Sequence, residues 1–274
     1  MSRHWEVFAF KYAERNARTR KDSFIFDDHP ANQHGMDYFV WLLRSGERQI
    51  LIDTGYDAEE AQRRDRPILR DPTSALSAFG VDAATIDEVV ITHLHYDHAG
   101  GLDRYPAATF HVQEAEMVYA TGPCMCHGTL KMPFTADHVC QMIQHVYSGR
   151  VIFHDGDGQI APGVTLHRVG GHSRGLQVVR VETASGPLCL ASDASHYYEN
   201  FIAGKPFPIV VDAQDMLSGF DRIIALAGSE NRVIPGHDPL VMSHFPMVDR
   251  VDFARRLDVG PDGGLDLSRF RTGG

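Results

Sequence analysis

Three histidines and one aspartate lie within six consecutive residues of this chain, at His93, His95, Asp97 and His98. The preceding residues, 88–92, form an apolar β-branched run that predicts a buried strand, and the glycine pair at 100–101 predicts a turn. Four potential metal ligands therefore follow the carboxyl end of a strand. Imidazole and carboxylate groups suit Zn, Fe, Co or Mn. Because the cluster follows a buried strand and includes an acid, we interpret it as a metal site rather than as surface histidines in a polar loop.

The spacing of the cluster indicates two ions. His93 and His95 project from the same face of an extended segment and can bind one ion together. Asp97 and His98 lie where the chain begins to turn, so they can serve a second ion beside the first. Two metals roughly 3.5–4 Å apart form the usual centre for hydrolytic displacement.

The composition is that of an ordinary soluble enzyme. The chain has 274 residues, of which 43% are hydrophobic and 23% charged, and we predict one hydrolase domain over residues 1–274. A net charge of −10 argues against nucleic acid as a partner. Residues 1–22 contain basic side chains but no continuous apolar core, which predicts neither a signal peptide nor a membrane anchor, and hence a cytoplasmic location. The four cysteines are typical of reduced thiols.

Apolar runs at 38–43 and 49–52 predict a hairpin in a buried sheet. It ends at Asp53, followed by Thr54 and Gly55. An acid at a strand end can orient a metal-binding histidine, but a turn-forming aspartate is an equally good interpretation. Other short strands are expected at 5–10, 24–26 and 109–112, and helices at 57–66, 73–79, 136–147 and 215–227.

Polar side chains also follow three later strands. Runs at 152–153, 164–169, 176–182 and 188–191 predict a β-meander. His172 follows the second of these runs, Asp193 follows the last, and His237 follows the run at 232–235. Each residue alone is weak evidence, but their shared position at strand ends groups them with the histidine cluster.

Residues 121–149 form a looser segment that includes Cys124, Cys126, His127 and Phe134. The Cys-x-Cys-His spacing matches no common zinc module, so a buried loop with thiols is the favoured interpretation. The methionines and Phe134 suit either an apolar substrate pocket or the underside of a helix. We therefore mark 121–149 as a candidate substrate-pocket insertion.

The order His-x-His-x-Asp-His, then His, Asp and His, resembles the metallo-β-lactamase superfamily over about residues 38–238. The resemblance implies an α/β fold, an αβ/βα sandwich with the site along one edge. It also implies a partition of ligands that the residues alone do not give. One metal would be bound by His93, His95 and His172, the other by Asp97, His98 and His237, with Asp193 as a bridge.

Within the superfamily the chain is most similar to N-acyl homoserine lactonases, through residues 98–101 and through Asp193-Ala194-Ser195 followed by a tyrosine pair and Asn200. True β-lactamases would have Cys or Ser in place of Asp193, and flavo-diiron proteins would have Glu in place of His95. A glyoxalase II would need more helical chain after the last histidine than residues 238–274 provide. The sequence departs from the lactonase pattern at His196, where those enzymes carry a catalytic tyrosine.

These observations predict a metal-dependent hydrolase that opens a lactone ring, either an N-acyl homoserine lactone or a related lactone. The cofactors would be two divalent ions, with zinc preferred over iron, cobalt or manganese, and water activated between them would attack the ester carbonyl. Asp193 would move the proton, and Tyr197, with His196 as its competitor, would donate to the developing oxyanion. The predicted catalytic residues are Asp97, Asp193 and Tyr197.

Other functions stay open. The same centre would suit another dinuclear hydrolase of esters, thioesters or phosphodiesters, or a mono-iron persulfide dioxygenase. A binding protein that keeps its metals without turnover is not favoured, because every expected ligand is present. The expected partner is a small lactone or ester, with no nucleic acid or membrane, and the oligomeric state, including a homodimer, is left open.

Overall fold

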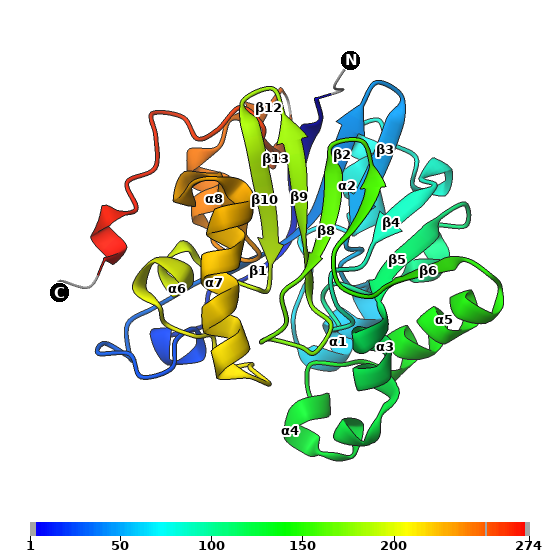
Figure 1. The fold of residues 1–274 in the computed structure, drawn as a ribbon, viewed down its shortest axis with the longest axis horizontal. Coiled ribbons are helices and arrows are strands. Elements are labelled where there is room, and N and C mark those ends of the chain that lie inside the picture. Colours follow the sequence, from blue (N-terminus) through cyan, green and yellow to red (C-terminus); the bar gives the residue numbers. More distant parts are fainter. Residues whose placement is uncertain (1–3, 250, 272–274) are drawn as a thin grey trace.

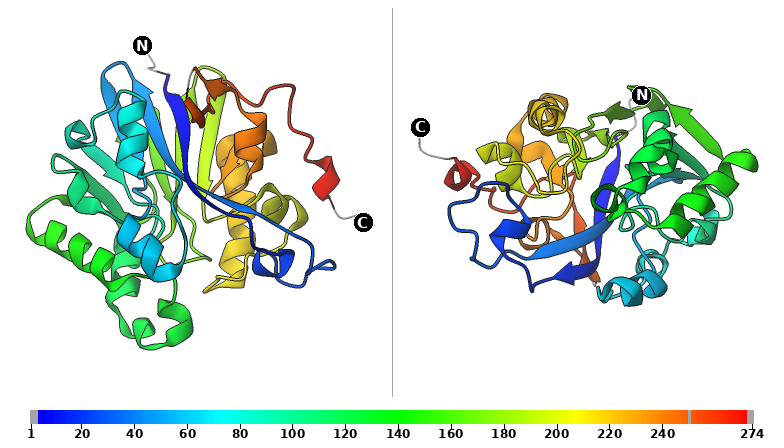
Figure 2. Two further views of the ribbon diagram at one scale, coloured as in Figure 1. Left: turned by 180° about the vertical axis from the view of Figure 1, so that it is seen from behind. Right: turned by 90° about the horizontal axis from the view of Figure 1, so that it is seen from below.

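Two β-sheets pack face to face between outer layers of helices in the computed structural model, which describes residues 4–249 and 251–271 (Figures 1 and 2). The larger sheet has the strand order β12-β13-β1-β2-β3-β4-β5-β6. Its strands are β1 (Glu6–Arg15), β2 (Met36–Ser45), β3 (Arg48–Ile52), β4 (Glu88–Val90), β5 (Thr109–Gln113), β6 (Val151–His154), β12 (Met247–Val248) and β13 (Val251–Arg256). The smaller sheet, in the order β11-β10-β9-β8-β7, contains β7 (Gly158–Ala161), β8 (Val164–Arg168), β9 (Gln177–Thr183), β10 (Gly186–Ser192) and β11 (Val233–Pro235).

The helices cover the outer faces of the sheets (Figure 2). They are α1 (Ala58–Arg64), α2 (Pro72–Ala78), α3 (Glu114–Thr121), α4 (Gly128–Lys131), α5 (Ala136–Tyr147), α6 (Tyr198–Ala203), α7 (Ala213–Ala227) and α8 (Leu240–His244). Within residues 4–249 and 251–271, every helix falls short of the length and apolarity needed to cross a bilayer.

Burial on both faces explains the continuous apolar runs of the central strands. Nine of the ten residues of β2 are buried, because one face meets the second sheet and the other meets helices. β2 pairs antiparallel with β3 across the tight turn, whereas β3, β4, β5 and β6 run parallel to one another. The predicted hairpin and the αβ/βα sandwich are therefore confirmed.

Helix α7 belongs to an outer layer, and its sequence determines where it begins, which face it buries and where it ends. The Asp212 side chain caps its first turn by accepting hydrogen bonds from the backbone N–H groups of Gln214 and Asp215. Its buried residues recur at helical spacing and pack against β10, and Gly228 ends the helix in the left-handed conformation, at φ 79°. The predicted helix at 215–227 is thus present, beginning two residues earlier.

Two strand predictions are wrong. Residues 24–26 form a turn, in which Phe24 N–H donates to Arg20 O and Phe26 has φ 56°. The run at 152–153 is not part of a meander with the later strands, because β6 pairs parallel with β5 at the edge of the larger sheet. The antiparallel meander begins instead at β7 and continues to β10.

A histidine pair lies on the last two strands at one edge of the larger sheet, β5 and β6. His111 Nδ1 on β5 is 3.0 Å from His154 Nε2 on β6. Burial lowers the pKa of His111 to about 4, and the neighbouring His154 and Arg48 charges act in the same direction. Burial also lowers the pKa of His154. Both rings are therefore neutral in the folded protein at pH values where the unfolded chain is protonated.

We expect this pair to make the protein sensitive to mild acid. As the pH falls from about 6.5 towards 4, the unfolded chain binds a proton at position 111 that the folded protein refuses, so the free energy of unfolding decreases. His111→Gln cannot titrate and keeps a hydrogen-bonding group. Between pH 7 and pH 4.5 it should lose roughly 2 kcal/mol less unfolding free energy than the wild type. Urea denaturation of both proteins at the two pH values measures this; equal losses would contradict it.

Candidate metal centre

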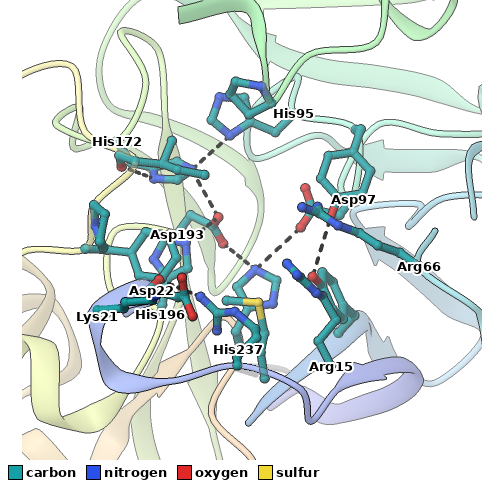
Figure 3. A pocket seen from close by; sticks show the side chains of 18 residues that line it. Arg15, Lys21, Asp22, Arg66, His95, Asp97, His172, Asp193, His196 and His237 are labelled. Atoms are coloured by element: carbon teal, nitrogen blue, oxygen red, sulfur yellow. Dashed lines mark hydrogen bonds and ion pairs between the residues drawn. The ribbon is translucent and has the colours of Figure 1, made fainter. Parts of the chain in front are cut away.

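The predicted ligands meet at the carboxyl ends of β4, β10 and β11 (Figure 3). Ligating atoms of one group lie within 4.8 Å of one another, and so do those of a second group. The first group is His93, His95, His172 and Asp193, and the second is Asp97, His98 and His237; Asp193, His196 and His237 form a third, overlapping combination. All seven side chains are buried. Residues up to 144 positions apart in sequence, from His93 to His237, therefore form one site.

The loop after β4 brings the first histidines together just before the chain turns. β4 ends at Val90, His95 forms an isolated β-bridge with Phe134, and the N–H groups of His98 and Ala99 both donate to the carbonyl of His95 in the turn that follows. The rings of His93 and His95 are adjacent, with centroids 4.4 Å apart. Gly100 packs this turn closely: a Cβ there would lie 2.7 Å from the Gly55 carbonyl oxygen. The predicted grouping of His93 with His95 is thus present.

Neighbouring groups fix the orientation of several imidazole rings. His172 Nδ1 donates to the carbonyl of Ile209 at 2.8 Å, and His237 Nδ1 donates to the carbonyl of Asp37 at 2.8 Å. His98 Nδ1 donates to Asp53 at 2.7 Å. A proton held on Nδ1 leaves the Nε2 lone pair free to face the centre of the site, which is the usual arrangement of metal-binding histidines.

Asp193 lies between the two groups of ligands. One carboxylate oxygen, Oδ2, is 3.1 Å from His172 Nε2, and the other, Oδ1, is 2.9 Å from His237 Nε2 and 3.3 Å from His98 Nε2. Gly236 allows this approach, because a Cβ there would lie 2.8 Å from Asp193 Oδ1. Each oxygen of one side chain therefore faces a different group of ligands, as a bridging carboxylate would.

The donor set suits divalent metal ions. Three buried ligating atoms, His93 Nε2, His98 Nε2 and Asp193 Oδ1, make no hydrogen bond, although buried polar atoms normally do. Burial holds the pKa values of His93 and His95 well below the ordinary range, so their rings are neutral. Burial also opposes a charge on His98, but nearby carboxylates raise its pKa all the same. The site thus combines neutral imidazoles with a net attraction for positive charge.

Asp53 orients one of these ligands from behind. Its side chain is fully buried and accepts hydrogen bonds from the Thr92 N–H at 2.7 Å, the Thr92 hydroxyl at 2.8 Å and His98 Nδ1. One carboxylate therefore fixes both the start of the ligand loop and the ring of His98. Of the two interpretations of Asp53, the structure favours the one in which it orients a histidine.

Glu116 joins two ligand loops and was not expected from the sequence. It lies in the first turn of α3 with its side chain fully buried. Its oxygens accept hydrogen bonds from Leu94 N–H at 2.9 Å, the Ser173 hydroxyl at 2.7 Å and Gly175 N–H at 2.9 Å. The loop of His93 and His95 is thereby tied to the loop of His172. An acid in the first turn of a helix usually lies at the surface, so the sequence carries no indication of this role.

The two residues proposed as oxyanion donors occupy different places. His196 lines the central cavity, with Nε2 3.0 Å from Asp193 Oδ2 and its ring stacked on Phe207. Tyr197 does not line it: its hydroxyl accepts a hydrogen bond from Arg18 at 2.6 Å, and its ring packs against Phe24 and His34. The expected approach of Tyr197 to the substrate is therefore not seen, because its hydroxyl is turned towards Arg18.

A cavity of about 260 Å³ opens beside Asp97, Asp193 and His237. Sequence reasoning missed several of its lining residues, and four of these are basic. The basic ones are Arg15, Arg18, Lys21 and Arg66, and the others are Tyr38, Tyr96 and Phe207. Three of the basic residues lie within positions 15–21, so the clustering of charge near the amino terminus was the available indication.

The sequence was compared with family models and with known proteins, and both comparisons find related hydrolases. A family model described as the metallo-beta-lactamase superfamily matches residues 36–246. An N-acyl homoserine lactonase from Bacillus cereus is 27% identical over 225 residues, which are 76% of this chain and 84% of the relative. An N-acyl homoserine lactonase AttM from Rhizobium johnstonii is 31% identical over 178 residues, 62% of this chain and 65% of the relative.

The fold is also similar to that of a solved N-acyl homoserine lactone hydrolase with the product N-hexanoyl-L-homoserine bound at its catalytic metal centre. The TM-score is 0.72 at 23% identity, covering 88% of this chain and 95% of that one. At this identity the likeness supports the fold alone.

Proposed function

The chain belongs to the metallo-β-lactamase superfamily, and from this premise we propose that it is a metal-dependent hydrolase that opens a lactone ring. The observation that carries the proposal is the carboxylate of Asp193, which faces one ligand group with each oxygen beside a cavity of substrate size. Relatives named N-acyl homoserine lactonases support lactones as the class of ester.

In this proposal one ion is bound by His93, His95 and His172, and the other by Asp97, His98 and His237, with Asp193 between them. Zinc is the preferred metal, since four-coordinate sites of imidazole and carboxylate suit it. Divalent ions bound here would lower the pKa of a water molecule and polarise the ester carbonyl.

The side chains around the cavity then guide the proton and the substrate. Asp193 accepts the proton of the attacking water and returns it to the ring oxygen as the ester bond breaks. His196 Nε2 donates to Asp193 Oδ2 at 3.0 Å, and its stacking on Phe207 keeps that oxygen in place. Asp97 also lines the cavity and would hold the second ion, which would stabilise the negative charge of the leaving oxygen.

The 121–149 segment forms one wall of this site in the proposal. Pro133 lines the cavity, its carbonyl accepts a hydrogen bond from Tyr96 N–H at 2.8 Å, and Phe134 packs edge-on against His95. A smaller side cavity of about 90 Å³ continues from His95 and His172 between this segment and residues 208–211. Its largely apolar lining would take a short hydrocarbon part of the substrate.

A panel of esters tests the proposed activity. Hydrolysis rates would be measured for acyl-homoserine lactones, simple γ- and δ-lactones, an aryl ester, a thioester and a phosphodiester, using protein of known metal content. We expect the highest kcat/KM among the lactones. A phosphodiester or thioester that is hydrolysed faster than every lactone would reject the proposal.

The metal content is a separate prediction. Elemental analysis of protein purified without added metal, then supplemented, should approach two ions per chain, because the seven predicted ligands form two groups. His98→Ala or His237→Ala should lose one ion preferentially, whereas His167→Ala, on β8 and outside these groups, should keep both. A value that stays near one after supplementation would contradict the dinuclear assignment.

A further inference from the structure

Four basic side chains surround a cavity that already faces the metal ligands. Arg15 and Arg66 extend from the side of Asp97, and Lys21 lies on the opposite side near His196 (Figure 3). Arg18 lines the cavity as well. Within residues 4–249 and 251–271, none of these four cations forms an ion pair with a carboxylate within 4.0 Å. Many other basic residues of the protein do form such pairs, for example Lys11, Arg20, Arg48 and Arg64. This concentration of positive charge occurs in a chain whose net charge is −10.

Of the four basic residues, Arg18 gives the strongest indication of an anionic ligand. Its side chain is buried, with a relative exposure of 6% for the residue. Its guanidinium donates to the Tyr197 hydroxyl at 2.6 Å and to the Asp22 carbonyl at 2.5 Å, and it lies over the Phe207 ring. All these partners are neutral. The Asp22 carboxylate acts on Arg18 only from beyond ion-pair distance, so the buried guanidinium has no paired carboxylate and an anion in the cavity would stabilise it.

Arg66 and Arg15 supply positive charge across the cavity. Arg66 is half-buried and donates to the Tyr96 hydroxyl, which in turn donates to Tyr38 at 3.3 Å. Arg15 lies on the same side of the cavity as Arg66 (Figure 3). Neither guanidinium has its fork committed to a carboxylate, and a fork of this shape binds a carboxylate or phosphate through two hydrogen bonds.

The carboxylates in the lining do not neutralise this charge. Asp97 and Asp193 belong to the ligand groups, so two divalent ions would more than balance them. Asp22 directs its Oδ2 to the Thr19 N–H at 2.9 Å, and its single charge offsets only part of that of Arg18 and Lys21. With the metals bound, the cavity therefore has a clear excess of positive charge, and in a partly buried space such an excess favours an anionic ligand.

On the basis of the proposed lactone hydrolysis, we infer that the substrate is a small lactone or ester that carries its own anionic group, a carboxylate or similar oxyanion. The ester lies at the metal ligands while the anionic group binds the guanidinium groups of Arg18 and Arg66. A volume of about 260 Å³ suits such a compact molecule. A neutral lactone can accept hydrogen bonds from these cations but brings no opposite charge to pair with them.

The test uses two matched probes: γ-butyrolactone with a carboxylate on its γ carbon, and the same lactone with a carboxamide there. The wild-type enzyme should show at least a tenfold higher kcat/KM for the carboxylate. Arg18→Gln and Arg66→Gln should each reduce this ratio by roughly ten- to a hundred-fold, the range for a lost charged hydrogen bond. Arg168→Gln removes the same charge from an exposed position on β8 and should leave the ratio unchanged. If Arg18→Gln does not fold, Arg66→Gln decides alone.

Calorimetric binding of the two ring-opened products gives a readout that does not need turnover. The product with two carboxylates should bind the metal-loaded wild type at least tenfold more tightly than the product with one carboxylate and one amide, and both arginine variants should lose this preference. Equal affinities, or variants that keep the preference, would overturn the inference. If neither lactone is opened, the ester panel above decides the proposed activity, and the binding preference still decides whether the cavity selects anions. A phosphate-bearing ligand that binds more tightly than the dicarboxylate would identify phosphate as the preferred oxyanion.

Discussion

Asp193→Asn is expected to lower kcat for lactone opening by about 10²–10⁴-fold, the range for a lost acid–base group. The variant keeps the size of the side chain and one oxygen but removes its charge and its basicity. Asparagine would also direct an amide N–H₂ group at His172 Nε2 or His237 Nε2, the atoms that now lie 3.1 Å and 2.9 Å from the carboxylate oxygens. Both the proton transfer and the bridging of the two ligand groups should suffer.

Metal content must be measured on the same sample, since a lost ion would also lower the rate. Asp258→Asn is a matched control: Asp258 is also a buried aspartate, but its Oδ1 accepts from Val7 N–H, away from the cavity. That variant should retain the wild-type kcat. Near wild-type turnover by Asp193→Asn with two ions bound would show that Asp193 is only a structural neighbour.

The fold was predictable where a local pattern determines the element. Buried runs predicted β2 and β3, and helical spacing with a closing glycine predicted α7. Pairing between distant strands was less accessible. The run at 152–153 resembles its neighbours in composition, and only tertiary contacts place β6 beside β5 rather than in the meander. The run at 24–26 failed because hydrogen bonds to Arg20 and Pro206 hold it as a turn.

The candidate site, like the fold, was predictable from the sequence only in part. The candidate ligand types stand out because a buried strand followed by histidines is unusual, so these side chains could be assigned to one site in advance, whereas their division between two ions came from the family resemblance. Glu116 and Arg18 could not, since a helical glutamate and a loop arginine look like surface residues until the chain folds over them. Tyr197 was assigned from its place in a motif, and only the structure shows its hydroxyl bound to Arg18.

This contrast has a physical basis. Metal ligands must meet at one point, and strand ends achieve this by a rule of topology that is visible in the sequence. Substrate specificity depends on which side chains line the remaining space, and here those come from β1, the loop after it and the chain after α1. No local pattern connects Arg18 with Arg66, so the charge of the cavity follows only from the three-dimensional arrangement.

Asp53→Asn is expected to weaken binding of one metal ion by about ten- to a hundred-fold, as other losses of a partner behind a ligand do. The Asp53 carboxylate accepts from Thr92 and from His98 Nδ1 at the same time. An asparagine has one acceptor oxygen, so its amide group would face a donor on the other side, and either the ligand loop or the His98 ring would lose its partner. The ion held by His98 should be the one affected.

Asparagine is the suitable replacement because Asp53 has φ 61°, a left-handed conformation that asparagine tolerates better than most residues. Asp65→Asn makes the same change at φ 52° on an exposed aspartate at the end of α1 and should leave metal affinity unchanged. Competition with a chelator measures both affinities, and kcat at saturating metal should recover much of the loss in the Asp53 variant, because Asp53 acts through His98 and does not touch the substrate. Unchanged affinity for both ions would show that the Thr92 contacts alone hold this loop, and a kcat that stays low at full metal occupancy would show that Asp53 influences the reaction itself.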